Sequence, residues 1–364
     1  MIKPIRILFT NWVDVDNFNA QSLNVREIAC RLDSERFLST LFYAKEPDPR
    51  LVHLPHVRLI KIPRRLGTIR VLVECVKGHD IMFSPPLNRI GYLYFRIPEF
   101  LRKRTTTIQW IEADIAVHLK DVSHSIKKIF DATYNRRDFY VATTEYVAER
   151  AAIDYGIHAS QVICTGVDSD VFYPPESRTS SPLRVLFVGH LIERKGPQWV
   201  LKAASICRDL KFVLVGEKRG EFYKKLLRMV EDERLNNVTF LQPMSQFLLA
   251  KLMAESHILL HPALVESPGK VIMEAAATGL PAIIFSQYRS PAVVDGVTGF
   301  QVDDFEEMIA RLKLLSNNDN LRRDMGEAAV AYMRQFDWKF IVKEWEKVFE
   351  RVLTEKRGNR LAFN

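Results

Sequence analysis

Residues 262–281, PALVESPGKVIMEAAATGLP, combine a Ser-Pro-Gly-Lys segment with two glutamates. The spacing of the apolar residues predicts a helix whose first turn falls in this segment, directly after a strand-like run at 257–262. The first N–H groups of a helix have no carbonyl partner within it and carry the positive end of its dipole, so they favour an anion such as a diphosphate. The residues of this junction are Ser267, Gly269, Lys270 and Val271.

The two glutamates of this stretch, Glu266 and Glu274, lie on either side of the junction. Glu266 falls in the loop before the helix. Glu274 falls within the helix, on a face that is otherwise apolar, where a lone carboxylate needs hydrogen-bonding partners. The hydroxyl groups of a ribose would provide such partners.

A second loop of this kind follows the strand-like run 184–189 and reads HLIERKG. Glycine lets a ligand approach the backbone closely, and arginine and lysine supply charge for an anion at the start of the next helix. The loop predicts a phosphate-binding site, although it matches neither the Walker nor the G-x-G-x-x-G pattern, and a solvated loop is the alternative. The residues concerned are Gly189, His190, Arg194, Lys195 and Gly196.

Short apolar runs, rich in β-branched and aromatic residues, alternate with helical patterns along the whole chain. This alternation predicts parallel sheets covered by helices, in which ligands bind beyond the carboxyl ends of the strands. The runs of the first half are 5–10, 39–44, 79–84, 105–111, 139–144 and the start of 161–175, and those of the second half are 184–189, 211–216, 238–241, 257–262 and 281–285.

A polar segment at 176–183, ESRTSSPL, interrupts this alternation, which starts again at residue 184. A chain of 364 residues is also long for one core. We therefore expect two doubly wound α/β domains, one at 1–175 and one at 184–337, joined by this linker.

The net charge of +8 is concentrated in one segment, residues 58–104, which holds eleven basic and three acidic residues. The end of that segment, GYLYFRIPEFLRKR, interleaves aromatic with basic residues. This composition suits an anionic membrane surface or another polyanion, and a solvated basic face is the alternative.

The cysteines and acidic residues give no indication of a metal site. No Cys or His pair has zinc-ligand spacing, and the Asp-x-Asp sequences at 14–16 and 168–170 are typical of turns. No apolar run reaches the roughly 18 residues of a membrane span. We expect no metal or other cofactor, and a cytoplasmic protein with reduced thiols at Cys30, Cys75, Cys164 and Cys207.

Over about residues 140–352 the chain resembles the retaining GT-B glycosyltransferases of family 4, the glycosyltransferases group 1 domain. The segments that carry the resemblance are, in order, TGVDSDVFYPP, VLFVGHLIERKG, HPALVESPGKVIMEAAATGLP, VDGVTGFQV and FDWKFIVKEWEKVFERV. The resemblance implies the GT-B fold, in which two Rossmann-like doubly wound parallel-sheet domains face each other across a cleft. It also implies that the terminal helix, 338–354, packs back on the first domain.

The resemblance further implies a role for each residue of the two loops. Lys195 and Arg194 would hold the nucleotide diphosphate together with the amides at the start of the following helix. Glu274 would bind the ribose hydroxyls, and Glu266 would contact the donor sugar beside the reacting carbon. The base would lie against the turn that contains Met244.

Several positions depart from the family pattern. His190 stands where arginine is usual, so a permanent charge becomes a titratable one. The glycine-rich turn after the first strand is replaced by 17–22, NFNAQS, and Gly-Gly with a glutamate is replaced by 286–292, SQYRSPA. Glu112 and Asp114 follow the strand after which a histidine is often found.

The acceptor side is expected in the first domain. Asn11 and Trp12 follow the first strand and would line an acceptor pocket, with simple packing as the alternative. Glu112 would face the acceptor hydroxyl, or would be a plain surface acid.

The resemblance implies a metal-independent, retaining transfer of a sugar from a UDP- or GDP-linked donor to a glycan, lipid-linked or small-molecule acceptor. The basic segment 58–104 favours peripheral attachment to the inner face of a membrane. Two alternatives remain. One is a non-catalytic homologue that binds sugar nucleotides, and the other is a binder of polyanions or nucleic acids.

Overall fold

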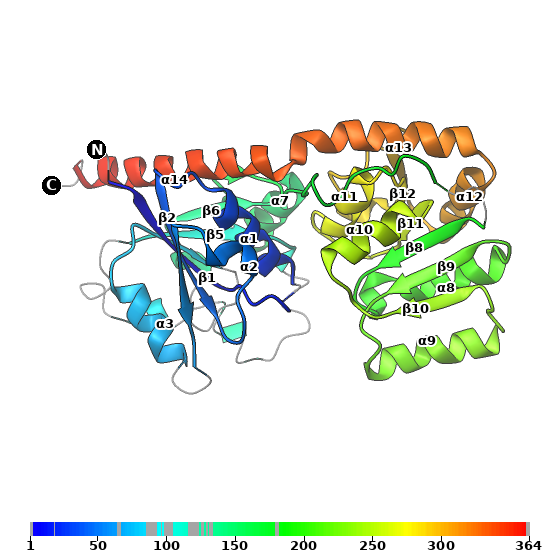
Figure 1. Cartoon of the computed structure of the whole chain (residues 1–364), viewed down its shortest axis with the longest axis horizontal. Helices are drawn as coiled ribbons and strands as arrows, with labels where there is room; N and C mark the ends of the chain where they lie inside the picture. Colours follow the sequence, from blue (N-terminus) through cyan, green and yellow to red (C-terminus); the bar gives the residue numbers. More distant parts are fainter. Residues whose placement is uncertain are drawn as a thin grey trace. The chain divides into compact units, whose positions relative to one another are not determined.

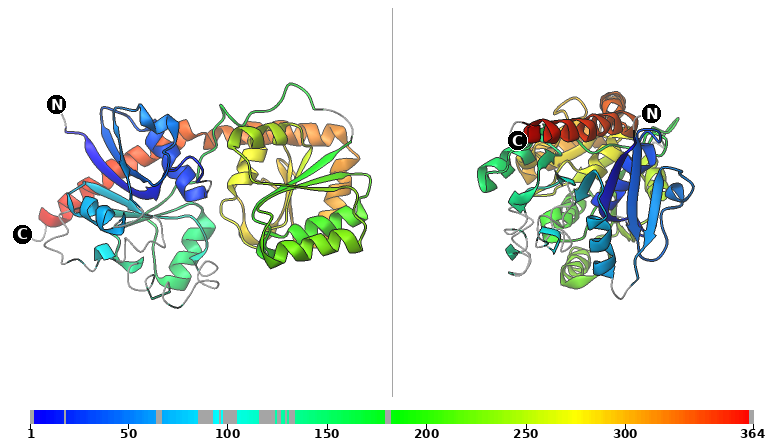
Figure 2. Two further views of the ribbon diagram at one scale, coloured as in Figure 1. Left: turned by 60° about the horizontal axis from the view of Figure 1, so that its bottom comes forward. Right: turned by 90° about the vertical axis from the view of Figure 1, so that its left-hand side faces the viewer.

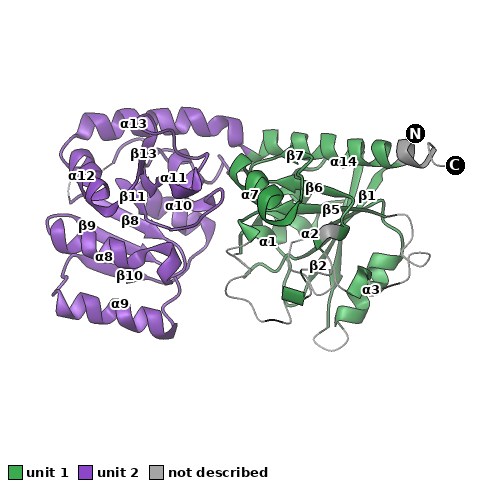
Figure 3. Ribbon diagram, turned by 180° about the vertical axis from the view of Figure 1, so that it is seen from behind, with its two compact units in different colours: residues 1–166, 338–364 green, residues 167–337 purple. Residues whose placement is uncertain are grey.

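The computed structural model describes residues 3–17, 19–63, 67–84, 93–95, 97, 105–115, 124, 127–128, 130, 134–178 and 182–361. The chain forms two compact units (Figures 1 and 3). Unit 1 consists of Met1–Gly166 together with Trp338–Asn364, and unit 2 consists of Val167–Asp337.

Unit 1 contains a seven-stranded parallel sheet with the strand order β3-β2-β1-β4-β5-β6-β7. The chain moves outward from β1 to β3 and then returns to place β4 on the other side of β1. This reversal makes the carboxyl ends of β1 and β4 the switch point of the sheet. The strands are β1 (Ile5–Trp12), β2 (Phe37–Tyr43), β3 (Val57–Lys61), β4 (Ile81–Ser84), β5 (Thr106–Ile111), β6 (Phe139–Ala142) and β7 (Gln161–Val162).

The described helices of unit 1 pack on this sheet, and some of them carry recognisable capping residues at their ends. The Asn19 side chain caps the first of them by accepting from the Ser22 N–H at 2.8 Å, and Gly156, with φ 63°, ends another. They are α1 (Ala20–Arg31), α2 (Pro49–Val52), α3 (Gly67–Val76), α7 (Glu145–Tyr155) and α14 (Trp338–Leu361).

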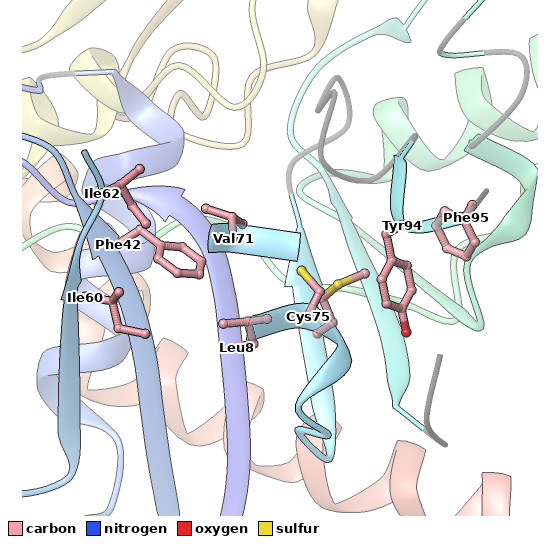
Figure 4. Packing of buried hydrophobic residues seen from close by; sticks show 9 residues of the cluster. Leu8, Phe42, Ile60, Ile62, Val71, Cys75, Tyr94 and Phe95 are labelled. Carbon is pink, nitrogen blue, oxygen red and sulfur yellow. The ribbon is translucent and has the colours of Figure 1, made fainter. Parts of the chain in front are cut away.

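Helix α3 covers the β1–β3 side of the sheet through an apolar cluster (Figure 4). Val71 and Cys75 of the helix lie in this cluster with Leu8, Phe42 and Ile60 of the three strands, and all five are buried. The apolar residues of a helical pattern and of three strand patterns therefore meet in one core.

Helix α14 belongs to unit 1 although it ends the chain. The Trp345 ring lies edge-on to Phe83 at 5.1 Å and to Trp110 at 4.9 Å between centroids. The Glu346 carboxylate accepts from the Asp33 N–H at 3.0 Å. Buried aromatic pairs of this kind stabilise the contact beyond the apolar area that they remove from water.

Unit 2 contains a six-stranded parallel sheet with the strand order β10-β9-β8-β11-β12-β13. The first strand of the unit, β8, thus lies between β9 and β11, and the switch point lies between β8 and β11. The strands are β8 (Arg184–Val188), β9 (Lys211–Val215), β10 (Val238–Leu241), β11 (Ile258–His261), β12 (Ala282–Phe285) and β13 (Gly299–Val302).

Helices lie on both sides of the second sheet (Figure 2). Helices α8 to α11 each connect one strand to the next, as in a doubly wound fold, whereas α12 and α13 follow the last strand, β13. The helices are α8 (Pro197–Ile206), α9 (Gly220–Asp232), α10 (Gln246–Ala254), α11 (Lys270–Ala277), α12 (Phe305–Ser316) and α13 (Asp319–Met333).

The predicted fold class, two Rossmann-like doubly wound parallel sheets, is confirmed. Two strands, β3 and β13, were not among the predicted runs. The division between the units also differs from the predicted linker at 176–183. Residues 167–175 belong to unit 2, because the Val167 N–H donates to the Phe336 carbonyl at 2.9 Å and Val167 forms a parallel bridge with Asp337.

In the part of the chain that the structure describes, no helix is long and apolar enough to cross a membrane. The four cysteines are free thiols, and burial raises the pKa of the Cys30 and Cys75 thiols to about 12.

Candidate functional site

Two loops meet at the switch point of unit 2. One follows β8 and contains a short 3-10 helix, Glu193–Lys195, and the other follows β11. The Leu264 N–H donates to the Arg194 carbonyl at 2.9 Å, so the two loops are joined backbone to backbone. Gly196 has φ 78°, and a Cβ atom there would lie 2.0 Å from the Pro262 oxygen. Only glycine permits this approach.

An ion pair between Lys195 and Glu266 connects the side chains of the two loops. The side chains are 13% and 16% exposed, so the pair is largely removed from solvent. Burial alone would raise the pKa of Glu266, but the Lys195 charge and the hydrogen bond from His261 outweigh it and hold this pKa well below its ordinary range. Glu266 is therefore ionised at neutral pH.

His261, the last residue of β11, is the second partner of Glu266. Its Nε2 atom lies 3.4 Å from the Glu266 Oε2 atom, and its ring stacks on Phe187 at 5.8 Å between centroids. Burial lowers the pKa of His261, so the ring is neutral at neutral pH. Since an ionised carboxylate can only accept, the proton of this neutral ring lies on Nε2.

Tyr288, in the short helix Ser286–Tyr288, brings a third polar group towards this carboxylate. Burial raises the pKa of Tyr288, and the negative charge of Glu266 raises it further. The Tyr288 hydroxyl and the His261 Nδ1 atom are both buried, and neither has a hydrogen-bond partner among the described residues. Buried polar atoms without partners are costly, and a polar ligand would satisfy them.

Helix α11 begins at Lys270, with Gly269 as its N-cap at φ 85°. A Cβ atom on Gly269 would lie 2.6 Å from the Ile272 Cδ1 atom and 3.3 Å from the Glu266 Cγ atom, so the turn packs closely against Glu266. The Ser290 hydroxyl donates to the Pro268 carbonyl at 2.8 Å and ties the loop to the segment after β12. Ser267, Lys270 and Val271 remain partly exposed at this junction.

Glu274 is buried within α11 and has polar neighbours from two elements. The Gln246 amide of α10 donates to the Glu274 Oε1 atom at 3.5 Å, and the Lys270 Nζ atom lies 3.8 Å from the same oxygen. Ser245 caps α10, and the partly buried Met244 precedes it in the loop after β10. The loop predicted to face the base is thus linked to the glutamate predicted to bind the ribose.

Gly189 and His190 form the first part of the loop after β8. A Cβ atom on Gly189 would lie 3.5 Å from the Phe187 ring and 3.8 Å from the His261 Cε1 atom. His190 is exposed as a residue, yet desolvation of its ring lowers its pKa, and the charge of Lys195 lowers it further. His190 is therefore neutral at neutral pH.

The acceptor-side residues lie in unit 1. Asn11 is buried near the carboxyl end of β1, and its Oδ1 atom has no hydrogen-bond partner among the described residues. Trp12 is partly buried and packs on Phe42 at 6.3 Å between centroids. Glu112, directly after β5, accepts from the Asn24 amide at 2.7 Å. Asp114 lies 3.7 Å from the Arg150 Nε atom.

Sequence reasoning missed four residues of these sites: His261, Tyr288, Gln246 and Asn24. A histidine that ends a buried strand beside a switch point is a signal that could have identified His261. The other three are recognised only through contacts distant in sequence.

Two doubly wound parallel sheets of this kind define the GT-B fold. Solved structures share it. Sucrose-phosphate synthase from Thermosynechococcus elongatus superimposes with a TM-score of 0.82 at 18% identity, covering 97% of this chain and 100% of that one. Anabaena Alr3699/HepE in complex with UDP-glucose gives a TM-score of 0.79 at 18% identity, covering 95% and 100%.

Residues 173–331 match the family Glycosyl transferases group 1. D-inositol 3-phosphate glycosyltransferase of Paenarthrobacter aurescens is 31% identical over 219 residues, 55% of this chain and 54% of the relative. An uncharacterized glycosyltransferase of Methanocaldococcus jannaschii is 23% identical over 327 residues, 82% of this chain and 81% of the relative. The chain spans about half the length of the D-inositol 3-phosphate glycosyltransferases that it matches.

Proposed function

We propose that this chain is a glycosyltransferase that moves a sugar from a nucleotide-diphosphate sugar to an acceptor hydroxyl, with retention and without a metal ion. One observation carries the proposal. The loops after β8 and β11 are joined at the switch point of unit 2, where Lys195, Glu266 and the start of α11 come together.

The donor diphosphate binds between these two loops. Lys195 and Arg194 supply the positive charge, and the first amides of α11 supply hydrogen-bond donors. The diphosphate takes Lys195 from Glu266, which leaves that carboxylate to accept from hydroxyls of the donor sugar. Glu274, held between Gln246 and Lys270, accepts from the ribose hydroxyls.

The chemistry follows from charge. Breaking the bond between sugar and phosphate builds negative charge on the diphosphate, and preorganised cations and helix amides stabilise this charge where it develops. The sugar ring becomes oxocarbenium-like, and the ionised Glu266 lies beside it. The acceptor attacks on the face that the diphosphate leaves, and a diphosphate oxygen takes its proton.

A uridine or guanosine diphosphate sugar is the expected donor class. The support for uridine is that Alr3699/HepE, which shares the fold, was solved with UDP-glucose. A glycan, a lipid-linked sugar or a small polyol is the expected acceptor class.

Thermal unfolding with UDP, GDP, ADP and their sugar conjugates tests the donor. A ligand that binds the folded state raises Tm with its concentration over Kd, so we expect one base to separate from the others. Release of nucleotide from the nucleotide sugar by wild type, and the absence of that release in the Glu266→Ala variant, would then show catalysis. The departure at His190 favours the rival, a non-catalytic homologue, and nucleotide binding without any release would establish it.

Attachment to an anionic membrane remains a second part of the proposal. The described portion of segment 58–104 includes α3, where Ile69 is 57% and Val73 is 45% exposed, with Arg70 between them. Residues 64–66, 85–92, 96 and 98–104 lie outside the described residues. Sedimentation with vesicles that contain anionic lipid tests this, and no binding at low salt would exclude it.

A further inference from the structure

Two donors share one oxygen of the Glu266 carboxylate. The Lys195 Nζ atom contacts the Glu266 Oε2 atom, and the His261 Nε2 atom lies 3.4 Å from the same oxygen. Neither of these contacts, which are the hydrogen bonds that the Glu266 side chain makes among the described residues, involves its Oε1 atom. The carboxylate is thus held through one oxygen by a cation and by a neutral ring.

The two donors differ in how firmly they are held. His261 is the last residue of β11, is paired with Ile284 of β12 and is 1% exposed. Its ring stacks on Phe187 at 5.8 Å between centroids, with 16° between the ring planes. Lys195 ends the 3-10 helix of the loop after β8 and carries its charge on a flexible four-carbon stem. The lysine can therefore change partner while the histidine stays in place.

Binding of the donor diphosphate requires such a change of partner. The diphosphate oxygens attract Lys195 away from Glu266, whose side chain is only 16% exposed. A largely buried carboxylate that loses its last partner carries a high desolvation cost, and this cost opposes the departure of the lysine. A second donor that stays on the same oxygen removes part of this cost.

His261 suits this role because it is neutral. Burial lowers the pKa of His261, so its ring donates from Nε2 without adding a positive charge. A cation in its place would cancel the charge of Glu266, as Lys195 does. A neutral donor orients the carboxylate and leaves its charge for the hydroxyls of the donor sugar.

We propose that His261 is a positioning residue that lets Lys195 leave Glu266 for the donor diphosphate. Its Nε2–H group stays on the Glu266 Oε2 atom when the lysine moves, and the Oε1 atom then accepts from the donor sugar. No proton changes place in this exchange. The inference rests on the diphosphate site of the proposed function, and it connects diphosphate binding to the carboxylate that contacts the sugar.

A double-mutant cycle with pyrophosphate tests the exchange. Calorimetric titration of the full chain at neutral pH gives the pyrophosphate affinity of wild type, His261→Phe, Glu266→Gln and the double variant. Phenylalanine keeps a ring on Phe187 but has no N–H group. We therefore expect His261→Phe to bind pyrophosphate about tenfold more weakly, as the loss of a hydrogen bond to a charged group predicts. In the Glu266→Gln background the same substitution should have no effect, because no carboxylate then competes for Lys195.

Two further variants separate positioning from packing. His261→Gln retains an N–H donor and should restore most of the affinity that is lost in His261→Phe. His257→Phe changes another buried histidine, just before β11, which accepts from the Arg184 N–H at 3.0 Å, and it should bind pyrophosphate as wild type does. Wild-type affinity in His261→Phe, or an equal loss with and without Glu266, would overturn the inference.

Nitrogen-15 NMR of wild type tests the same contact without a change in packing. The ring nitrogens of His261, assigned by comparison with His261→Gln, report which of them carries the proton. We expect the proton on Nε2 both without and with saturating pyrophosphate, and a shift of the Nε2 resonance when the lysine leaves the shared oxygen. A proton on Nδ1, or a charged ring, in the presence of pyrophosphate would also overturn the inference.

Failure of the proposed function gives a different result. If the cycle shows the loss that depends on Glu266, but wild type releases no nucleotide from any nucleotide sugar, the transferase proposal fails and the exchange at Lys195 stands. If wild type releases nucleotide and the cycle shows no such loss, the inference alone fails. A wild type that binds neither pyrophosphate nor UDP would overturn both.

Discussion

The N–H group of Leu264 donates to the carbonyl of Arg194 at 2.9 Å, across the switch point of the second sheet. This bond joins the loop that carries Lys195 to the loop that carries Glu266 through the backbone alone. Preorganised cations and dipoles need little rearrangement when charge develops, which is how electrostatic catalysis is most effective.

Gly196→Ala tests how closely the two loops approach. Both the positive φ of Gly196 and the overlap with the Pro262 carbonyl disfavour a Cβ atom. Since each strained feature costs about 1–3 kcal/mol, we expect the free energy of unfolding to fall by about the sum of two such costs. Gly220→Ala is the matched control, since Gly220 has φ 83° with nothing within 4 Å. Urea unfolding measures both variants. Equal losses would mean that the approach to Pro262 carries no cost.

The diphosphate and ribose subsites can be separated by ligand. Lys195→Met should weaken binding of both pyrophosphate and UDP by about 10- to 100-fold, the value of a hydrogen bond to a charged group. Glu274→Gln should weaken UDP binding alone, because pyrophosphate has no ribose. Calorimetric titration gives these affinities. Lys211→Met, at the amino end of β9, is the control and should bind both ligands normally. Equal weakening of both ligands by Glu274→Gln would contradict the ribose assignment.

The ion pair between Lys195 and Glu266 makes the stability of unit 2 depend on pH. The folded-state pKa of Glu266 lies below its ordinary value of 4.5, so the stabilisation is complete above that value and is lost as the pH falls towards the folded-state pKa. Glu266→Gln leaves a largely buried lysine without this carboxylate, so at neutral pH we expect a loss of about 3 kcal/mol that shrinks in acid.

The control for this prediction is an exposed pair of the same unit. Arg184 and Glu255 lie 3.0 Å apart, with side chains 32% and 50% exposed, so Glu255→Gln should cost less than about 1 kcal/mol. Chemical unfolding at several pH values measures both variants. A Glu266→Gln variant as stable as wild type at neutral pH would show that the pair contributes nothing.

His190 should make diphosphate binding depend on pH. Its pKa is below the ordinary 6.5, so it is neutral at neutral pH and becomes charged only in mild acid. We expect His190→Arg to bind UDP about tenfold more tightly at neutral pH, since charge-assisted hydrogen bonds contribute roughly 1.5–3 kcal/mol. His190→Gln serves as the reference for protonation of UDP itself. If the ratio of the UDP affinities of wild type and His190→Gln stays constant from neutral pH to mild acid, protonation of His190 does not affect UDP binding.

Much of the architecture could be predicted from the sequence because buried parallel strands are short apolar runs. β3 escaped prediction because VRLIK places two charged residues among three apolar ones, as an edge strand can, and β13 because GFQV is short and begins with glycine. The position of Val167 in unit 2 depends on Asp337, which a local pattern cannot reveal.

The candidate site was predictable where one loop carries its own chemistry, as the loops of Lys195 and Glu266 do. It was not predictable where two distant side chains must meet. Gln246 reaches Glu274 from another helix. Asn24 reaches Glu112 although the two residues are 88 positions apart in the sequence. Such pairs become visible only after the strand order is known.

Val167 and Asp337, the first and last residues of unit 2, form a bridge with each other. Unit 2 is therefore inserted into unit 1 with its two ends side by side. If unit 2 were expressed alone from a gene fragment, its first and last residues would still lie next to each other. A premature stop codon after Asp337 would have the opposite effect. It would spare the inserted unit and uncover Phe83 and Trp110, in the sheet encoded at the other end of the gene, by removing Trp345.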